Sequence, residues 1–480
     1  MSETFDVLSE GWIPVIDLTG ERRKLGIWET LETANTLREI SDISVMVEYG
    51  LYRFLSVFLM DALRPRTTGD LEDLLEDGEF PMDSIAEYVQ ICRREGVSFD
   101  LFDPKRPFMQ TPYCSKWDKQ EKPVGVLDYT LPAGNNHVHF DHRDPESISM
   151  VYDQAARHLI SAQIFCPKGG RGYSPNINGA PPYFTVVKGR NLFETLVYGL
   201  SVTDRIENLD DPPVFWRNTE PVEPKKEVVR TSWLYGMLFP ARRITLIPNE
   251  GKVSRIYYNP GLKYATKENW EDPYVTYLEG KQGRSPWRPN AEKAVWRNLS
   301  DLVDVKGKTA PKNFRQFFEL EKESEEAVIS LYGVQTHNAS FLNMVRYELN
   351  VPAYLTQDED YIRYIKACVS AAEECANGLK RSLGGMPDIT ATMTAQSVQR
   401  YYDQCEHLFW RYCRNLEEKD QNLMEAYGAW CQELLRMVRQ VRDETLSSVQ
   451  LSGQALVTAA KMEKEIAFSA KRIRKESMNG

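Results

Sequence analysis

Long apolar runs, paired cysteines and a leader-like start are all missing from this sequence. No apolar stretch is long enough to span a bilayer. The first residues, Met1 to Asp6, are acidic and lack the basic segment and the apolar stretch of a secretory signal. The 8 cysteines form no Cys-x-x-Cys pair, which argues against a zinc ribbon and against a thioredoxin-like site. We therefore expect a cytoplasmic protein with reduced cysteines and no membrane contact.

An excess of positive charge is missing as well. Lys and Arg total 59 against 69 Asp and Glu, so the formal net charge is −10. A free-standing protein that binds DNA without regard to sequence normally needs the opposite balance, because phosphate contacts supply most of its affinity. This charge is still compatible with a subunit that touches DNA through one local patch while its partners supply the remaining positive charge.

Catalytic signatures begin at several places and are incomplete at each. Lys306 to Thr309 starts like a phosphate-binding loop, but Leu302 stands where that loop needs its first glycine. His142 to Asp144 starts like a kinase catalytic loop, without any glycine-rich nucleotide loop to accompany it. Gly170 to Gly172 starts like a dinucleotide fingerprint, but Pro175 replaces its third glycine. We therefore expect no catalysis by this chain alone.

What is present fits a globular protein of more than one domain. The chain has 480 residues, of which 42% are hydrophobic and 27% charged. Residues 358–480 carry four stripes of apolar residues that step by three and four, which predicts an antiparallel four-helix bundle. The stripes are Tyr361, Ile365, Cys368, Ala372, Cys375 and Leu379; Val398, Tyr401, Cys405, Leu408, Tyr412 and Leu416; Leu423, Tyr427, Trp430, Leu434, Val438 and Val441; and Ala459, Met462, Ile466, Ala470 and Ile473.

Residues 1–357 have a different character. Strand-like pieces such as Tyr183–Val187 and Arg255–Tyr258 alternate irregularly with helix-like stretches such as Val45–Leu63 and Ile148–Gln163. There is no regular strand–helix–strand rhythm and no internal repeat. The predicted fold class is therefore α+β, with a large irregular mixed body followed by the C-terminal bundle.

Three of the 6 histidines gather in one short segment. His137 and His139 would share one side of a strand, which is the arrangement of a two-histidine metal platform. The other interpretation is a loop that meets a partner or a nucleic acid, since no third ligand is evident nearby in the sequence. Both interpretations stay open at this point.

A series of short strings resembles one known family, the CasA-type large subunit of the type I-E CRISPR Cascade complex. Their order and spacing make the resemblance specific and extend it along the whole chain. The strings are Gly11–Val15, Arg106–Gln110, Leu131–Asn136 through Phe140–His142, Gly169–Gly172, Phe184–Gly189 and Tyr332–Ser340. The C-terminal bundle completes the layout.

This resemblance implies a role in an RNA-guided complex. The subunit would recognise the protospacer-adjacent motif in double-stranded DNA from the minor groove, and would help to open the duplex for pairing with the guide. It would work with backbone, guide-handle-binding and small subunits, with CRISPR RNA and with a recruited helicase–nuclease that cuts the DNA. The implied protein is not an enzyme and needs no cofactor. The cysteine cluster that some relatives carry is missing, so no zinc is expected.

The resemblance also assigns a motif-reading region. A glycine loop lets backbone amides approach a crowded minor groove, and the matching residues are Gly169, Gly170, Arg171 and Gly172. A lysine nearby would donate to acceptors in the groove; by position this is Lys263, with Lys267 as the alternative. A flexible turn and ordinary surface lysines are the alternative interpretations of these residues.

The strand-separating wedge falls on His337, Asn338 and Ala339. The family often has Gln where this chain has Asn338, which is one methylene shorter, whereas His337 is aromatic and suited to stacking on a base. We expect a tight loop at this position, followed by a helix that starts at Phe341. In the alternative interpretation, Asn338 only caps that helix.

Two further groups of residues are expected to meet partners or nucleic acid. The loop that would contact a partner or the guide RNA contains Asn136, His137, His139, Phe140 and His142. Basic residues late in the bundle, among them Lys471, Arg472 and Arg474, are candidates for holding displaced single-stranded DNA or a neighbouring subunit. Solvated helix faces are the alternative for these late basic residues.

Two other functions remain as hypotheses beside the Cascade subunit. One is an enzyme with an unfamiliar histidine-based metal site around His137, His139 and Asp141. A stoichiometric transition metal in the purified protein would favour this hypothesis. The other is a purely structural subunit that bridges partners, against which motif-dependent DNA binding by the assembled complex would speak.

Overall fold

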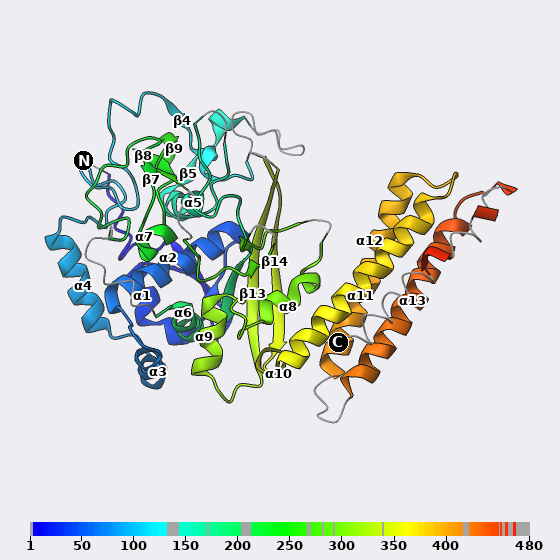
Figure 1. Cartoon of the computed structure of the whole chain (residues 1–480). Coiled ribbons are helices and arrows are strands. Elements are labelled where there is room, and N and C mark those ends of the chain that lie inside the picture. The colour runs from blue at the N-terminus through cyan, green and yellow to red at the C-terminus, as the bar shows by residue number, and fades with distance from the viewer. Residues whose placement is uncertain are drawn as a thin grey trace. The chain divides into compact units, whose positions relative to one another are not determined.

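The computed structural model of the chain divides into two compact units (Figure 1). The body consists of Met1–Pro289 and Lys308–Val351, and the helical unit consists of Asn290–Gly307 and Pro352–Gly480. The boundary predicted from the sequence lies after residue 357 and leaves 290–307 with the body. The structure describes residues 3–131, 144–169, 172–202, 213–265, 270–280, 283–290, 293–337, 340–415, 422–450, 452–453, 457–458 and 464–466.

The central helix of the body is α2 (Val45–Leu63), which has the bounds predicted from the sequence. It begins where the Ser44 hydroxyl accepts a hydrogen bond from the Val47 amide, and it ends at Arg64, whose backbone is left-handed. Nearly every residue of α2 is buried, so the helix is surrounded by the rest of the body. Helix α5 (Tyr152–Ile164) crosses it closely at Gly50, where a Cβ atom would lie 3.4 Å from the Ser161 Cα.

Short helices and small sheets surround this pair. The helices are α1 (Ile27–Glu32), α3 (Thr68–Asp77), α4 (Met82–Arg94), α6 (Leu192–Gly199), α7 (Trp233–Met237) and α9 (Lys312–Leu320), with 3-10 helices η1 (Ala34–Thr36), η2 (Val124–Leu127) and η3 (Pro145–Ser147). One sheet has the order β2-β1-β3 and is built from β1 (Ile13–Asp17), β2 (Arg22–Leu25) and β3 (Leu37–Ile40). None of the described helices is long and apolar enough to cross a membrane.

A second sheet contains the strand predicted around Arg255–Tyr258. This strand is β9 (Lys252–Pro260), which pairs with β8 (Arg242–Asn249) in an antiparallel hairpin. Strands β4 (Glu121–Pro123) and β5 (Met150–Val151) also pair with β9. Small two-stranded sheets join β7 (Glu227–Val228) with β10 (Lys263–Tyr264), and β11 (Tyr277–Leu278) with β12 (Ser285–Pro286).

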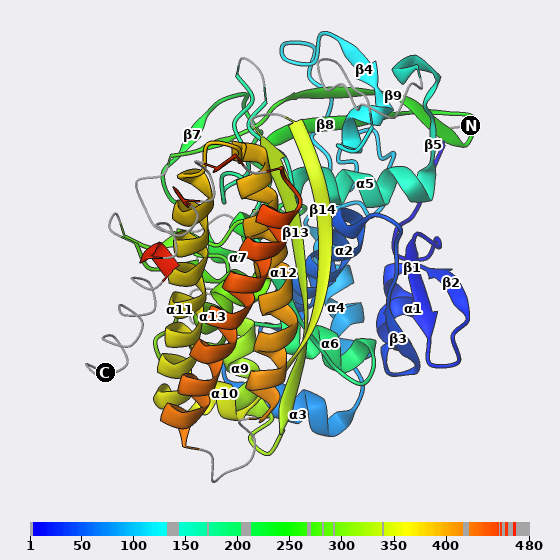
Figure 2. The ribbon, with the colours of Figure 1, turned by 90° about the vertical axis from the view of Figure 1, so that its right-hand side faces the viewer.

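The third sheet carries the segment that was expected to hold the wedge. Its order is β14-β13-β6, with β6 (Phe184–Lys188), β13 (Glu326–His337) and β14 (Ser340–Pro352). Both views show β13 and β14 as long neighbouring strands (Figures 1 and 2). The helix predicted from Phe341 is therefore wrong, and so is the alternative in which Asn338 caps it. Strand β14 contains aromatic and β-branched residues, which favour strands. It is also hydrogen-bonded to β13, which keeps it extended.

The helical unit confirms three of the four predicted stripes as helices. They are α11 (Glu359–Gly384), α12 (Ala391–Asn415) and α13 (Leu423–Ser447), which pack against one another, with short helices α8 (Leu299–Val303), α10 (Tyr354–Gln357) and η5 (Val295–Asn298). Helix α11 ends at Gly384, the first residue of a Gly-Gly-Met-Pro string of the kind that stops helices. Most of the fourth stripe lies outside the described residues. The predicted class, a mixed body followed by C-terminal helices, is confirmed.

Candidate nucleic-acid interface

The glycine loop, residues 168–173, leaves the end of α5 and has both of its ends fixed by one buried side chain. The Arg242 guanidinium donates to the carbonyl oxygen of Pro167 at 2.6 Å and to that of Ser174 at 2.5 Å. Arg242 is 1% exposed and lies at the start of β8. Since one rigid, planar group bonds the residues that flank the loop, the loop stands on a defined base.

Gln163 connects this base to the core of the body. Its side-chain amide donates to the Arg242 carbonyl at 2.8 Å and accepts from the Arg242 amide at 3.2 Å. Asn176, which follows the loop, donates from its side chain to the Gln163 carbonyl at 2.7 Å. All three side chains are buried, so their hydrogen bonds are shielded from water and hold the loop's ends firmly.

Three tyrosines contact one another in series, and we call Tyr129, Tyr173 and Tyr258 the tyrosine cluster; Tyr173 is the last residue of the glycine loop. The rings of Tyr173 and Tyr258 are stacked with centroids 5.9 Å apart, and the hydroxyls of Tyr129 and Tyr258 are 3.1 Å apart. Arg242 donates to the Tyr258 hydroxyl at 3.0 Å, and Lys122 donates to the Tyr173 hydroxyl at 2.7 Å. Burial raises the pKa of Tyr129 and of Tyr258, so these phenols stay protonated and available for hydrogen bonds.

Of the four residues predicted for the loop, the structure describes Gly169 and Gly172. A Cβ atom on Gly169 would lie 2.8 Å from the Tyr173 Cβ, so a side chain there would collide with the tyrosine cluster. Gly172 has a φ of 91°, which favours glycine, and a Cβ there would lie 2.6 Å from the Lys225 Nζ. Gly170 and Arg171 lie outside the described residues.

The lysine predicted to accompany the loop is already paired. The Lys263 ammonium lies 2.6 Å from the Glu227 carboxylate, on the neighbouring strand of the β7–β10 pair. Lys267, the alternative, lies outside the described residues. Both side chains of this pair are about half exposed, so the pair contributes little stability. The role expected for Lys263 stays a prediction.

Lys225, which the sequence did not single out, lies against the glycine loop. Its side chain is exposed and lies across Gly172, and that side chain forms no hydrogen bond or ion pair with the rest of the described chain. Its backbone has a φ of 64°, and its amide donates to the Gly261 carbonyl at 2.7 Å. The neighbouring Lys226, in contrast, lies 3.8 Å from both Glu220 and Glu223. No local pattern in the sequence marks Lys225, because its nearness to the loop depends on the fold.

The predicted wedge falls where β13 connects to β14. His337 is the last residue of β13, and residues 338 and 339 connect it to Ser340, the first residue of β14. The side chains of His337, Asn338 and Ala339 lie outside the described residues. Close to this connection, the ring of Phe341 stacks on Tyr129 with centroids 4.9 Å apart and planes at 10°.

Farther along the same strands, a buried carboxylate fastens the hairpin to α2. Glu48 is 3% exposed and accepts a hydrogen bond from the Tyr332 hydroxyl at 2.6 Å. It also accepts from the Arg346 guanidinium at 2.7 Å. Burial raises the pKa of Glu48, against the opposing effects of Tyr332 and Arg346. Both strands are thus tied to the central helix through one side chain.

A sequence profile of the family described as CRISPR-associated protein Cse1 matches residues 6–441. The chain belongs to the Cse1 family. This confirms the resemblance to the CasA-type large subunit of type I-E systems. Among curated proteins, no sequence matches the chain.

Solved structures share the fold of this Cse1-family chain over nearly its whole length. Thermus thermophilus CasA is 23% identical and covers 98% of this chain and 100% of its own, with a TM-score of 0.78. Thermobifida fusca Cse1 is 20% identical and covers 98% of each chain, with a TM-score of 0.79. A chain of a CRISPR RNA-guided surveillance complex is 18% identical and covers 92% of this chain and 99% of its own, with a TM-score of 0.72.

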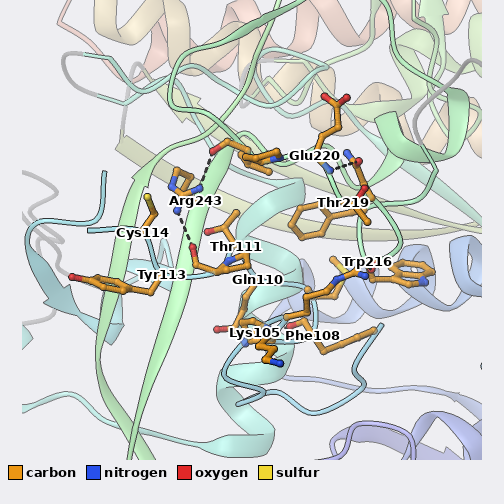
Figure 3. Close-up of a pocket in the computed structure, with 18 of the residues that line it drawn as sticks. Lys105, Phe108, Gln110, Thr111, Tyr113, Cys114, Trp216, Thr219, Glu220 and Arg243 are labelled. Atoms are coloured by element: carbon orange, nitrogen blue, oxygen red, sulfur yellow. Dashed lines mark hydrogen bonds between the residues drawn. The ribbon is translucent and has the colours of Figure 1, made fainter. Parts of the chain in front are cut away.

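A cavity of about 510 Å³ lies elsewhere in the body, beside the Arg106–Gln110 string (Figure 3). Three polar side chains of its lining, Arg106, Gln110 and Arg243, are bonded within the protein. Arg106 donates to the carbonyls of Glu95 and Trp216, and Gln110 donates to the Leu101 carbonyl and accepts from the Leu246 amide. Arg243 is paired with Asp118 at 2.7 Å. The string that helped to reveal the family therefore serves to hold the core together.

The loop with the histidine cluster lies outside the described residues, and this includes Asn136, His137, His139, Phe140 and His142. The late basic residues Lys471, Arg472 and Arg474 also lie outside them. In the part of the chain that the structure describes, no group of three or more His, Cys, Asp or Glu side chains is placed to hold a metal ion. The enzyme hypothesis with its histidine site stays a prediction.

Proposed function

We propose that this chain is the non-catalytic large subunit of an RNA-guided Cascade complex. In this role it recognises the protospacer-adjacent motif from the minor groove, helps to open the duplex for guide pairing and recruits the helicase–nuclease. Membership of the Cse1 family and the likeness to a chain of an RNA-guided surveillance complex support the proposal. Its partners would be the backbone, guide-handle-binding and small subunits, CRISPR RNA and double-stranded target DNA.

The observation that carries the proposal is the glycine loop with Lys225 lying across it. The minor groove is only about 6 Å wide and presents mainly acceptor atoms, so a reader needs a slim backbone and a donor. Gly172 supplies the slim backbone in a conformation that favours glycine. Lys225 supplies an ammonium with no carboxylate partner among the described residues, so DNA need not displace an existing ion pair.

The connection between β13 and β14 is suited to opening the duplex. Unstacking a base step costs a few kcal/mol, and guide pairing returns that energy only after the step has opened. A wedge must therefore rest on a support that resists being pushed back. Glu48 provides such support by bonding both Tyr332 on β13 and Arg346 on β14.

The test compares two adjacent lysines in the assembled complex. Lys225→Ala should weaken binding of motif-containing DNA and lower the slope of log affinity against log salt by about 1, because one cationic contact is lost. Lys226→Ala is the matched control, since Glu220 and Glu223 already neutralise that lysine. Equal behaviour of the two variants would contradict the assignment of Lys225.

Glycine variants are a less selective test of the loop. A bulky residue at Gly169 would keep the loop backbone from approaching the groove closely. The structure places the Tyr173 Cβ 2.8 Å from the new Cβ, so this change would also displace the tyrosine cluster. The lysine pair separates contact with DNA from disturbance of the fold, and the glycine change does not.

A further inference from the structure

Phe341 is the first described apolar side chain after the connection between β13 and β14. It is half-buried, and its ring lies nearly parallel to that of Tyr129, at 10° and 4.9 Å. Along the rest of β14, several side chains are exposed, among them Leu342 and Tyr347. The stack with Tyr129 is therefore the aromatic contact that holds the end of the hairpin nearest to the predicted wedge.

Tyr129 is itself held in place from the other side. Its hydroxyl donates to the Ala162 carbonyl at 2.8 Å, within α5, and lies 3.1 Å from the Tyr258 hydroxyl. A ring whose hydroxyl is fixed in this way cannot slide along its neighbour without breaking hydrogen bonds. Phe341 thus rests on a fixed surface.

From Tyr258 the contacts continue to the glycine loop. Tyr258 accepts from Arg242, and Arg242 donates to the carbonyls of Pro167 and Ser174 at the two ends of the loop. Tyr258 also stacks on Tyr173, which lies against Gly169. An unbroken series of stacked rings and hydrogen bonds thus connects the start of β14 with the base of the glycine loop.

The regular spacing of base pairs in DNA explains why the loop and the wedge should be connected. Successive base pairs are about 3.4 Å apart along the helix axis, so a wedge displaced by that distance meets a different step. A loop that reads the motif and a wedge that enters the neighbouring step must therefore keep their spacing. Residues that fix this spacing act on opening without touching the DNA.

We infer that the stack of Phe341 on Tyr129 is a positioning contact that holds the wedge at a fixed distance from the motif-reading loop. The inference rests on the proposed function. Motif binding depends on the loop and on Lys225, whereas the place and speed of first opening depend on this stack. A change at Phe341 and a change at Lys225 therefore have different consequences.

The experiment uses Phe341→Ala in the assembled complex, on fully paired targets and on targets with a pre-made bubble beside the motif. Opening of paired targets should slow about three- to tenfold, the effect of losing one aromatic pair. Binding of bubbled targets should stay within about twofold of the unchanged protein, and Phe341→Trp should restore opening because it keeps a stacked ring. 2-Aminopurine placed at successive positions beside the motif reports which base opens first, and that position should spread in Phe341→Ala.

Tyr347→Ala is the matched control. Tyr347 lies on the same strand, and its ring contacts Tyr183 of the body at 6.4 Å and 60°, outside the tyrosine cluster. Its loss should leave both the rate and the position of opening unchanged. Phe341→Leu serves if the alanine variant folds poorly, since it keeps apolar volume and removes the ring.

The outcomes are distinct. Normal opening by Phe341→Ala, or equal losses on paired and bubbled targets by a folded variant, would overturn the positioning role. Slow opening in Tyr347→Ala as well would overturn it too, because any disturbance of β14 would then suffice. Failure of the proposed function itself would appear elsewhere, as unchanged motif binding in Lys225→Ala.

Discussion

The body and the helical unit are stabilised by different kinds of contact. In the body, buried ions are paired across long stretches of chain: Arg53 with Asp272, 219 residues apart, and Arg243 with Asp118, 125 residues apart, each at 2.7 Å. These side chains are at most 2% exposed. Such pairs do not follow from any local pattern, and they specify one arrangement of many irregular segments.

The core of the helical unit consists mainly of apolar side chains and thiols. Trp430, Leu434, Val438 and Val441 are fully buried along α13, and five free cysteines are buried among the three long helices. Among its described residues, the buried polar contacts include neutral hydrogen bonds, such as the Trp430 ring nitrogen donating to the Cys368 carbonyl and the Tyr401 hydroxyl donating to the Ala372 carbonyl. The comparison shows that both units have apolar cores, and that the body adds buried ion pairs that join segments far apart in the sequence.

The largest effect should come from breaking a buried ion pair in the body. Arg53→Met leaves the Asp272 carboxylate buried without its cation and should lower the free energy of unfolding by about 3–5 kcal/mol. Adding Asp272→Asn should recover part of that loss, because no uncompensated charge then remains. Urea unfolding measures both. Lys322→Ala, which breaks an exposed pair with Glu72, is the control and should change stability by less than about 1 kcal/mol. A small effect of Arg53→Met would remove the distinction between the two units.

A cavity in the helical unit should cost somewhat less. Leu434→Ala removes a fully buried side chain and should cost about 2–4 kcal/mol, because the surrounding helices relax only in part. Leu434→Met keeps the volume and should cost less than about 1.5 kcal/mol. Met424→Ala, at an exposed position of the same helix, serves as the reference. If the methionine variant were as unstable as the alanine variant, volume would not be what stabilises this unit.

The smallest effect concerns pH. Burial raises the pKa of Cys405 to about 12, whereas an unfolded thiol titrates near pH 8.5. The folded-state pKa is raised, so the stability from this group is complete below pH 8.5 and is lost as pH rises. Between pH 7 and about pH 9.2 each such thiol should lose about 1 kcal/mol. Cys405→Ala should reduce by about 1 kcal/mol the stability that the helical unit loses between pH 7 and about pH 9.2. Thermal unfolding at both pH values measures this difference. An unchanged pH dependence would contradict burial of this thiol in solution.

The same contrast explains what the sequence could predict. Helix α2 and the helices α11, α12 and α13 follow from local periodicity and end signals, such as Ser44 before α2 and Gly384 at the end of α11. Strand β14 was mistaken for a helix because its apolar residues do not alternate strictly, although its partner β13 directly precedes it and pairing with β13 keeps it extended.

The candidate site was predictable in part for the same reason. The glycine loop was marked by its own residues. Gly172 has a positive φ, which glycine adopts readily. Lys225, Arg242 and the stack of Phe341 on Tyr129 were not predictable, because each reaches the loop or the hairpin from a remote part of the chain. Lys263 was chosen by position along the chain, and its pairing with Glu227 became visible only in the structure.

The central claim about duplex opening is that the connection between β13 and β14 separates the strands beside the motif. The decisive experiment follows opening by the assembled complex carrying His337→Ala and Asn338→Ala together, on fully paired targets and on targets with a pre-made bubble. We expect an unchanged melting temperature, slow opening of paired DNA and normal binding of bubbled DNA, because only the first unstacking step needs the wedge. Equally poor or equally good binding of both targets would show that these residues are not the wedge, and Gln335 would then be the next candidate.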